Sequence, residues 1–233
     1  MKASPPPAPA PQGIADTGGA AARPPKAPEV PPHPLYLPER DEVVWSGRFA
    51  LQIVRFRYRR SDGTPSNSLT WELWRRGQGV VMLPYDPWTR RVALIEQFRL
   101  PALAAGEEPM MTECPAGLLE AGEDPEAAAR REVEEETGFI PDRVAPIGAF
   151  LLMQGGCDER MHFFCGRTRL PEPGLIGTRG LEAEGEETRV LVLDADAAYA
   201  MVARNEIRNV TAAMALMWLQ LNAKRLEEEW TTR

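Results

Sequence analysis

Three glutamates crowd one short stretch of the chain. Glu132 and Glu136 are four residues apart, and Glu135 follows Glu132 by three, so in a helix their carboxylates would share one face about 5–6 Å apart. Like charges at this spacing destabilise an isolated helix by roughly 0.2–0.5 kcal/mol, a cost that a divalent cation held by the carboxylate oxygens would offset. Two interpretations follow, a solvated acidic helix face or a binding site for metal ions.

The metal interpretation has a definite chemistry. Mg²⁺ keeps several waters and completes its octahedron with phosphate oxygens of a substrate, which suits hydrolysis of a phosphoanhydride bond. Mg²⁺ is therefore the expected cofactor, with Mn²⁺ as the alternative. Arg131 could hold a neighbouring carboxylate through a bidentate pair.

The residues around the glutamates predict the helix that would carry them. Asp124 suits the cap position, Pro125 the first helical position and Glu126 the first turn. Gly138 can adopt the left-handed conformation that follows a last helical turn. The sequence thus predicts a helix that starts at Asp124-Pro125 and stops at Gly138.

The composition limits the class of protein. The 233 residues carry a formal net charge of −7, which argues against a nucleic-acid polymer as partner because such a partner needs a basic face. The sequence has no apolar run near the roughly 18 residues of a membrane span. Three cysteines without zinc-like spacing indicate space-filling, reduced thiols in a cytoplasmic protein rather than nucleophiles: Cys114, Cys157 and Cys165.

The order of the other elements predicts an α/β fold. Residues 1–40 are expected to be a disordered tail, because a stretch rich in Pro, Ala and Gly buries too little apolar surface to offset chain entropy. Residues 41–78 are expected to form an antiparallel sheet with a turn at Asp62-Gly63. The main domain, 79–230, is expected to hold strands and two closing helices, the strands at 79–87, 90–100, 144–153, 160–170 and 188–194 and the helices at 195–204 and 210–227.

Residues 117–139 match a known signature. It consists of Gly, five residues, Glu, seven residues and Arg-Glu-apolar-any-Glu-Glu-any-Gly-apolar, here Gly117, Glu123, Arg131, Glu132, Val133, Glu135, Glu136, Gly138 and Phe139. A chance match at one start position is on the order of one in a billion. The stretch resembles the Nudix box, in which Gly117, Glu123, Arg131 and Gly138 would have structural roles.

The wider chain, from about residue 45 to 226, resembles the ADP-ribose pyrophosphatase branch of the Nudix family. The tracts that carry the resemblance are LPYDPWTRRVALIEQFRLPAL, ECPAGLLEAGE, GGCDERMHFFCGR, GLEAEGEETRV and ALMWLQLNAKRL. The resemblance implies an α/β/α sandwich with a mixed sheet. It also implies a homodimer in which the N-terminal sheet of each subunit contributes to its neighbour's site.

The resemblance further implies roles for individual acids. Metal ions would be bound by Glu132, Glu136, the backbone carbonyl of Ala116 and Glu186, with Glu135 as a further candidate on the same helix face. Glu184 matches the proposed general base for the attacking water. From the residues alone, the favoured interpretation of Glu182, Glu184, Glu186 and Glu187 is a solvated acidic loop.

Substrate contacts are also carried over from the family. They are Arg76 and Arg99 for phosphate or ribose, Leu118, Gln154, Gly155 and Glu159 around the terminal ribose, and Trp71 and Glu72 in the N-terminal sheet. Trp45 and Trp71 could stack on a base or serve core or dimer packing. The chain departs from the family twice: Met153-Gln154-Gly155 replaces a turn that usually contains proline, and Trp71 replaces an arginine.

These residues predict an enzyme that hydrolyses ADP-ribose to AMP and ribose 5-phosphate. The two departures leave open a second substrate of the same class, a different nucleoside diphosphate sugar such as GDP-mannose. A Nudix module that senses a nucleotide without cleaving it is disfavoured, because such modules lose box acids and all of them are present here.

Overall fold

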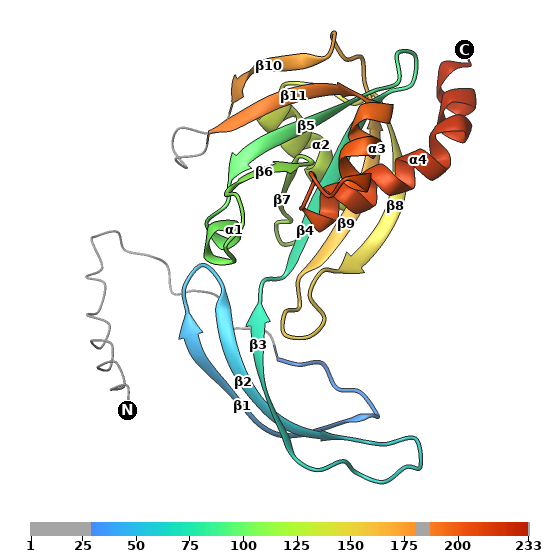
Figure 1. Cartoon of the computed structure of the whole chain (residues 1–233). Coiled ribbons are helices and arrows are strands. Elements are labelled where there is room, and N and C mark those ends of the chain that lie inside the picture. Colours follow the sequence, from blue (N-terminus) through green and yellow to red (C-terminus); the bar gives the residue numbers. More distant parts are fainter. Residues whose placement is uncertain (1–28, 180–186, 233) are drawn as a thin grey trace, which may run out of the picture.

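The computed structural model describes residues 29–179 and 187–232, which form two sheets and four helices (Figure 1). The N-terminal sheet is antiparallel and contains β1 (Tyr36–Ser46), β2 (Ala50–Tyr58) and β3 (Leu69–Arg75). In Figure 1 it lies below the larger sheet. The expected turn at Asp62-Gly63 is present, with Gly63 in the left-handed region at φ 81°.

The expected tail boundary at residue 40 is wrong. Strand β1 begins at Tyr36, whose ring packs against Phe56 of β2 with the centroids 5.7 Å apart. Pairing with β2 therefore extends the strand into a stretch that composition alone assigned to the tail. Residues 1–28 of that tail lie outside the described residues.

The larger sheet is mixed, as expected. Its strands are β4 (Gln78–Asp86), β5 (Arg91–Phe98), β6 (Met110–Glu113), β7 (Ala116–Leu118), β8 (Arg143–Leu151), β9 (Arg160–Arg167), β10 (Gly174–Arg179) and β11 (Thr188–Asp194). The order is β10-β11-β5-β4-β9-β8, with β6 paired to β5 and β7 paired to β4. Among the strands of the described residues, only β4 and β9 pair in parallel, so the sheet is mostly antiparallel.

Strands β4 and β5 separate beyond their first two pairs, and the short strands fill the gap. The two central strands pair only at 85–86 with 91–92. Further along, Ile95 of β5 pairs with Glu113 of β6, and Val81 of β4 pairs with Ala116 of β7. Residues 113–118 are thereby held in the middle of the sheet.

Helix α2 (Pro125–Thr137) covers one face of the larger sheet and has the expected ends. The Asp124 carboxylate accepts a hydrogen bond from the Ala127 N–H at 2.9 Å, and Gly138 ends the helix at φ 74°. Its buried residues pack on alternate residues of β4 and on β9: Ala128, Ala129 and Val133 against Val80, Met82 and Phe164. Small alanines allow this helix to approach the sheet closely.

Helices α3 (Ala195–Ala203) and α4 (Val210–Thr231) cover the opposite face. Here Leu216 and Leu219 pack in one core with Val81 and Leu83, the residues of β4 that point away from α2. The α/β/α sandwich is therefore confirmed. A short helix, α1 (Leu100–Ala104), follows β5. Among the described residues, no helix is long and apolar enough to cross a membrane.

Candidate active site

Two glutamates of α2 meet two consecutive residues of β7. The Glu136 carboxylate accepts a hydrogen bond from the Ala116 N–H at 3.0 Å. The Glu132 carboxylate lies against Gly117, where an added Cβ would be 2.5 Å from Oε2 and would overlap the rest of the group. The four-residue spacing and the missing side chain at position 117 thus bring both carboxylates to the same short strand. Ala116, Gly117, Glu132 and Glu136, all expected in the site, are assembled together.

Arg131 connects the neighbouring acids. Its Nη1 donates to Glu132 Oε1 at 2.8 Å and to Glu135 Oε2 at 3.1 Å, while its Nε donates to Glu123 Oε1 at 3.3 Å. Glu123 also accepts from the backbone N–H of Glu120, and these two interactions lower the pKa of its carboxyl. One guanidinium therefore orders three carboxylates of the 117–139 motif.

The carboxylate pair on β7 is largely removed from solvent. Glu136 is 9% exposed, and the side chain of Glu132 is 14% exposed. Burial raises the pKa of the Glu132 carboxyl above its ordinary value, and the adjacent Arg131 offsets part of that effect. Buried carboxylates are costly unless cations compensate them, and Glu132 shares the guanidinium of Arg131 with two other acids. The cluster can therefore accept further positive charge.

The donor set fits magnesium in kind. It consists of carboxylate and backbone oxygens, the ligands that Mg²⁺ prefers. Among residues 29–179 and 187–232, no three His, Cys, Asp or Glu side chains come together as a metal-binding group. The expected further ligand Glu186 and the expected base Glu184 lie outside the described residues, as does Glu182.

A half-buried ion pair joins Arg99 to strand β6, which precedes β7. Arg99 donates from Nε and Nη2 to the two carboxylate oxygens of Glu113, at 3.0 and 2.8 Å. Glu113 is 5% exposed and precedes Ala116 by three residues, whereas the side chain of Arg99 remains 38% exposed. Arg99, expected to bind phosphate or ribose, is thus oriented by a bidentate ion pair to the strand that leads to β7. Sequence reasoning missed Glu113, because its role is set by Arg99, which lies 14 residues away in the sequence.

A second set of contacts joins the N-terminal sheet to the loop before β9. Arg76 pairs with Glu159 at 2.7 Å, and its guanidinium lies 4.3 Å from the Phe49 ring centroid and 4.7 Å from that of Trp74. Asp158 accepts from the Arg76 N–H at 2.7 Å. Arg76 and Glu159, both expected to touch substrate, therefore contact each other. Phe49 and Asp158 were not predicted, because only their partners across the fold reveal them.

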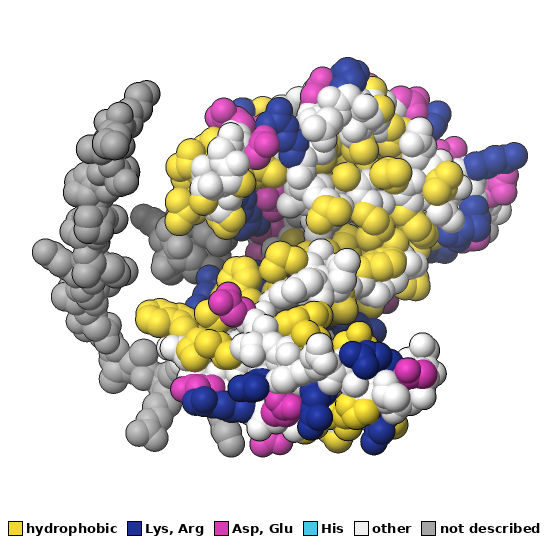
Figure 2. Space-filling view, turned by 60° about the horizontal axis from the view of Figure 1, so that its bottom comes forward, with side chains coloured by type: hydrophobic (Ala, Val, Ile, Leu, Met, Phe, Trp, Pro, Cys, Tyr) yellow, Lys and Arg dark blue, Asp and Glu magenta, His cyan; other side chains and the backbone are white. Residues whose placement is uncertain are grey.

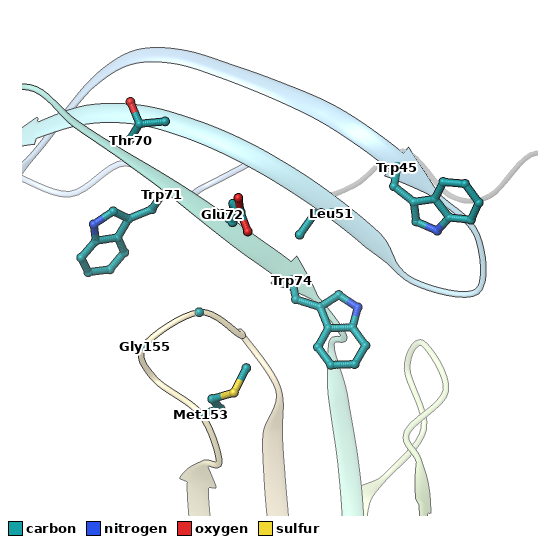
Figure 3. Close-up of a pocket in the computed structure, with 9 residues that line it drawn as sticks. Trp45, Leu51, Thr70, Trp71, Glu72, Trp74, Met153 and Gly155 are labelled. Atoms are coloured by element: carbon teal, nitrogen blue, oxygen red, sulfur yellow. The ribbon is translucent and has the colours of Figure 1, made fainter. Parts of the chain in front are cut away.

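A groove of about 720 Å³ opens beside these contacts (Figure 3). Its volume is in the range of small-molecule sites. Figure 3 shows Trp74 on the sheet side and Met153 on the loop side. The full lining is Trp45, Leu51, Thr70, Trp71, Glu72, Trp74, Met153, Gly155 and Gly156. The structure thus brings together three of the expected substrate residues here, Trp71, Glu72 and Gly155.

Three of the four residues expected around the terminal ribose do not line this groove: Leu118, Gln154 and Glu159. Gln154 is exposed between Met153 and Gly155, and Leu118 is half-buried in β7, paired with Gly79. Leu118 instead adjoins the carboxylate cluster, because Gly117 is its neighbour in the strand.

Trp71 and Glu72 belong to opposite faces of the N-terminal sheet. In the register of β2 and β3, Glu72 pairs with Ile53 and Trp71 pairs with Val54, so their side chains alternate. The Trp71 ring packs edge-on against Phe56, with the centroids 5.5 Å apart. Trp45 and Trp74, which both pair with Leu51, share the face of Glu72. Glu72 therefore shares its face of the sheet with the aromatic side chains of Trp45 and Trp74.

The groove and the carboxylate cluster are connected through β4 and β7. Arg76 precedes β4, in which Gly79, Val80 and Val81 pair with Leu118, Gly117 and Ala116 in turn. Strand β4 therefore begins next to the groove and pairs with Ala116 and Gly117, the two residues that meet Glu136 and Glu132. The arrangement suits an elongated ligand with a flat, aromatic end and an anionic middle.

Comparison with known proteins identifies relatives over most of the chain. Residues 75–214 match the family model described as NUDIX domain. The chain is 39% identical over 189 residues to the ADP-ribose pyrophosphatase of Escherichia coli (strain K12), covering 81% of this chain and 90% of the relative. It is 33% identical over 193 residues to the ADP-ribose pyrophosphatase of Haemophilus influenzae, covering 82% and 88%.

Two further similarities bear on substrate and fold. The chain is 33% identical over 182 residues to the GDP-mannose pyrophosphatase of Yersinia pestis (strain Pestoides F), covering 78% of this chain and 89% of the relative. A crystal structure described as an ADP compounds hydrolase superposes with a TM-score of 0.60 at 19% identity, covering 85% of this chain and 97% of the other. The structural likeness supports the fold alone.

Proposed function

The chain belongs to the Nudix family, and we propose that it is a magnesium-dependent hydrolase that cleaves ADP-ribose to AMP and ribose 5-phosphate. The observation that carries the proposal is the meeting of Glu132 and Glu136 with residues 116 and 117 of β7. Relatives at 39% and 33% identity are ADP-ribose pyrophosphatases and span most of this chain, which supports the choice of substrate.

The metal would be held by residues that already approach one another. Glu132, Glu136 and the carbonyl of Ala116 would supply ligands, Glu186 a further one, and Glu135 is an additional candidate beside Arg131. Bound there, Mg²⁺, or Mn²⁺ as the alternative, would neutralise phosphate charge and lower the pKa of a water. Arg131 would keep the carboxylates in place as the charge of the substrate changes.

Glu184 would take the proton from the attacking water. The water oxygen would form a bond to one phosphorus as the bond from that phosphorus to the bridging oxygen breaks, leaving two monophosphates. Arg99, held by Glu113, would face the negative charge that develops on phosphate oxygens. In these assignments the metal-binding acids, Glu184 and Arg99 would all act in one displacement.

The remaining residues would recognise the two ends of the substrate. Trp45 and Trp74 offer aromatic surface for a base, with Glu72 as a hydrogen-bond acceptor on the same face of the sheet. Arg76 and Glu159 border the groove, and Leu118, Gln154 and Gly155 would surround the terminal ribose. In this assignment Trp71 would contribute at the rim of the groove, since its ring packs on Phe56.

We further propose that the protein acts as a cytoplasmic homodimer. In Figure 2, apolar side chains form a band across the displayed face of the molecule, which includes the N-terminal sheet. In that sheet Val43, Val44 and Trp45 are 42%, 45% and 68% exposed, and exposed apolar patches mark interaction surfaces. All three cysteines are free and buried, which agrees with a reducing compartment.

GDP-mannose hydrolysis is the second candidate. One relative is a GDP-mannose pyrophosphatase, which favours this substrate. The two positions at which the chain differs from the ADP-ribose branch also favour it, because Gln154 is exposed and the Trp71 ring packs on Phe56. The deciding experiment measures kcat/KM with Mg²⁺ on a panel of nucleoside diphosphate sugars. We expect ADP-ribose to exceed GDP-mannose by roughly tenfold or more, a difference of about 1.4 kcal/mol in transition-state binding. The reverse order would transfer the proposal to GDP-mannose, and inactivity on every member would favour a nucleotide-sensing module.

A further inference from the structure

The covalent link between the two sheets is only two residues long. Strand β3 ends at Arg75 and β4 begins at Gln78, so Arg76 and Gly77 join the N-terminal sheet to the larger sheet. Gly77 has φ 78°, a left-handed conformation that glycine adopts without strain. The direction in which the N-terminal sheet leaves the larger sheet is therefore set at these two residues and by their contacts.

The carboxylate of Asp158 holds this link. Its Oδ1 accepts from the backbone N–H groups of Arg76 and Gly77, at 2.7 and 3.3 Å. Its Oδ2 lies 3.0 Å from Nε of Arg75, whose side chain is 10% exposed. Asp158 therefore contacts three consecutive residues where the two sheets are joined.

Backbone hydrogen bonds fasten the 152–159 loop to the same place. Trp74 donates its N–H to the Gly156 carbonyl at 2.8 Å, and its own carbonyl accepts from the Asp158 N–H at 3.1 Å. Just beyond the loop, the Arg160 N–H donates to the Gly77 carbonyl at 3.0 Å. The loop thus runs beside the end of β3 and the link to β4, and Asp158 contributes both its backbone and its side chain to this attachment.

The strand and the loop that are attached here form the two walls of the groove. Trp74 lies on the sheet side, and Met153 and Gly156 lie on the loop side (Figure 3). The walls meet at the hydrogen bond from Trp74 to Gly156. Their separation further from this bond depends on the angle between β3 and the loop. The contacts of Asp158 fix that angle, although Asp158 does not line the groove.

We propose that Asp158 is a positioning residue for substrate binding, which holds the link between the sheets against the 152–159 loop and so sets the width of the groove. The inference rests on the proposed function, because it assumes that the groove holds one end of the hydrolysed substrate. Asp158 acts through the groove walls and does not itself contact substrate. Since α2 and β7 make the contacts of Glu132 and Glu136, loss of Asp158 should weaken binding far more than it slows the chemical step.

The test compares Asp158→Ala with Asp142→Ala. Asp142 lies at the opposite end of the β8–β9 hairpin and forms a bidentate ion pair with Arg167 at 2.7 and 2.6 Å, so it controls for loss of an Asp–Arg pair from the same hairpin. Rates are measured on whichever panel member the wild type hydrolyses fastest. Asp158→Ala should raise KM roughly tenfold and keep kcat within about threefold, whereas Asp142→Ala should keep both within about twofold.

A conservative variant guards against a general loss of folding. Asp158→Asn keeps an acceptor oxygen for the N–H groups of Arg76 and Gly77 and loses the charge that faces Arg75. Its KM should therefore fall between the values of the wild type and of Asp158→Ala. An unchanged KM in Asp158→Ala, an equal rise in Asp142→Ala, or a lowered kcat with normal KM would overturn the inference. A KM in Asp158→Asn as high as in Asp158→Ala would overturn it as well.

A second readout does not need activity. Hydrogen exchange at the amides of Trp74, Asp158 and Arg160, whose bonds join the loop to the strands, should be faster in Asp158→Ala than in Asp142→Ala. If the wild type hydrolyses no member of the panel, the proposed function fails, while faster exchange would still support the role of Asp158 in the attachment. Equal exchange in the two alanine variants would overturn that role.

Discussion

At the scale of single residues, the site depends on an absent side chain. Because Gly117 has no side chain, it leaves the space that Glu132 occupies, and the Glu136 carboxylate accepts a hydrogen bond from the Ala116 N–H. The motif residues could be predicted because their spacing is local in the sequence. Glu113 and Asp158 could not, because their roles come from Arg99 and Arg76, which lie 14 and 82 residues away and meet them only through strand pairing and loop packing.

The general base can be tested by one substitution. Glu184→Gln removes the proton acceptor while keeping a side chain of similar size, so kcat should fall about 10²–10⁴-fold. Mg²⁺ binding, measured by titration calorimetry, should remain as in the wild type. Glu182→Gln is the matched control and should retain most of the activity. A Glu184→Gln variant with nearly full kcat would show that a different acid accepts the proton.

At the scale of elements, the helices could be predicted from local sequence signals, whereas the short strands depend on pairing with distant strands. Helix α2 could be predicted to the residue because Asp124 and Gly138 mark its ends, and α4 differed only in running to Thr231. The short strands β6, β7 and β10 were not predicted, since three to six residues do not establish an alternating pattern. They exist because β4 and β5 separate and because β11 offers an open edge. The carboxylate cluster depends on β7, the element least visible in the sequence.

The turn between β4 and β5 should depend on Asp86. This residue is 1% exposed, and its carboxylate accepts from the backbone N–H groups of Trp88, Thr89 and Leu170 at 2.9, 3.3 and 3.0 Å. Asp86→Ala leaves these donors without that acceptor and should lower the free energy of unfolding by roughly 2–4 kcal/mol. Urea denaturation followed by circular dichroism measures the change.

Asp194→Ala serves as the control for this measurement. Asp194 caps α3 without a side-chain hydrogen bond, and its side chain is 63% exposed. Its loss should therefore change the free energy of unfolding by less than about 0.5 kcal/mol. Equal effects of the two substitutions would refute the role given to Asp86.

At the scale of the whole molecule, the exposed apolar surface of the N-terminal sheet predicts self-association. Light scattering after gel filtration should give twice the chain mass of 25.9 kDa. Val44→Asp should shift the protein toward monomer, because a charge at a 45%-exposed valine would be buried in the interface. Leu221→Asp, at an 87%-exposed position on α4, should remain dimeric. A monomeric wild type would show that the protein does not self-associate. Dissociation by Leu221→Asp alone would show that the dimer forms through a different surface.

The products formed from ADP-ribose test the proposed hydrolysis most directly. With Mg²⁺, the wild type should release AMP and ribose 5-phosphate in equal amounts, and EDTA should stop the reaction. Glu136→Gln should lower turnover by several orders of magnitude with the fold intact, because a metal ligand is lost. Glu126→Gln, an acid-to-amide change in the first turn of the same helix, should remain active. Intact ADP-ribose after incubation with the wild type and Mg²⁺, or full turnover by Glu136→Gln, would contradict the assignment.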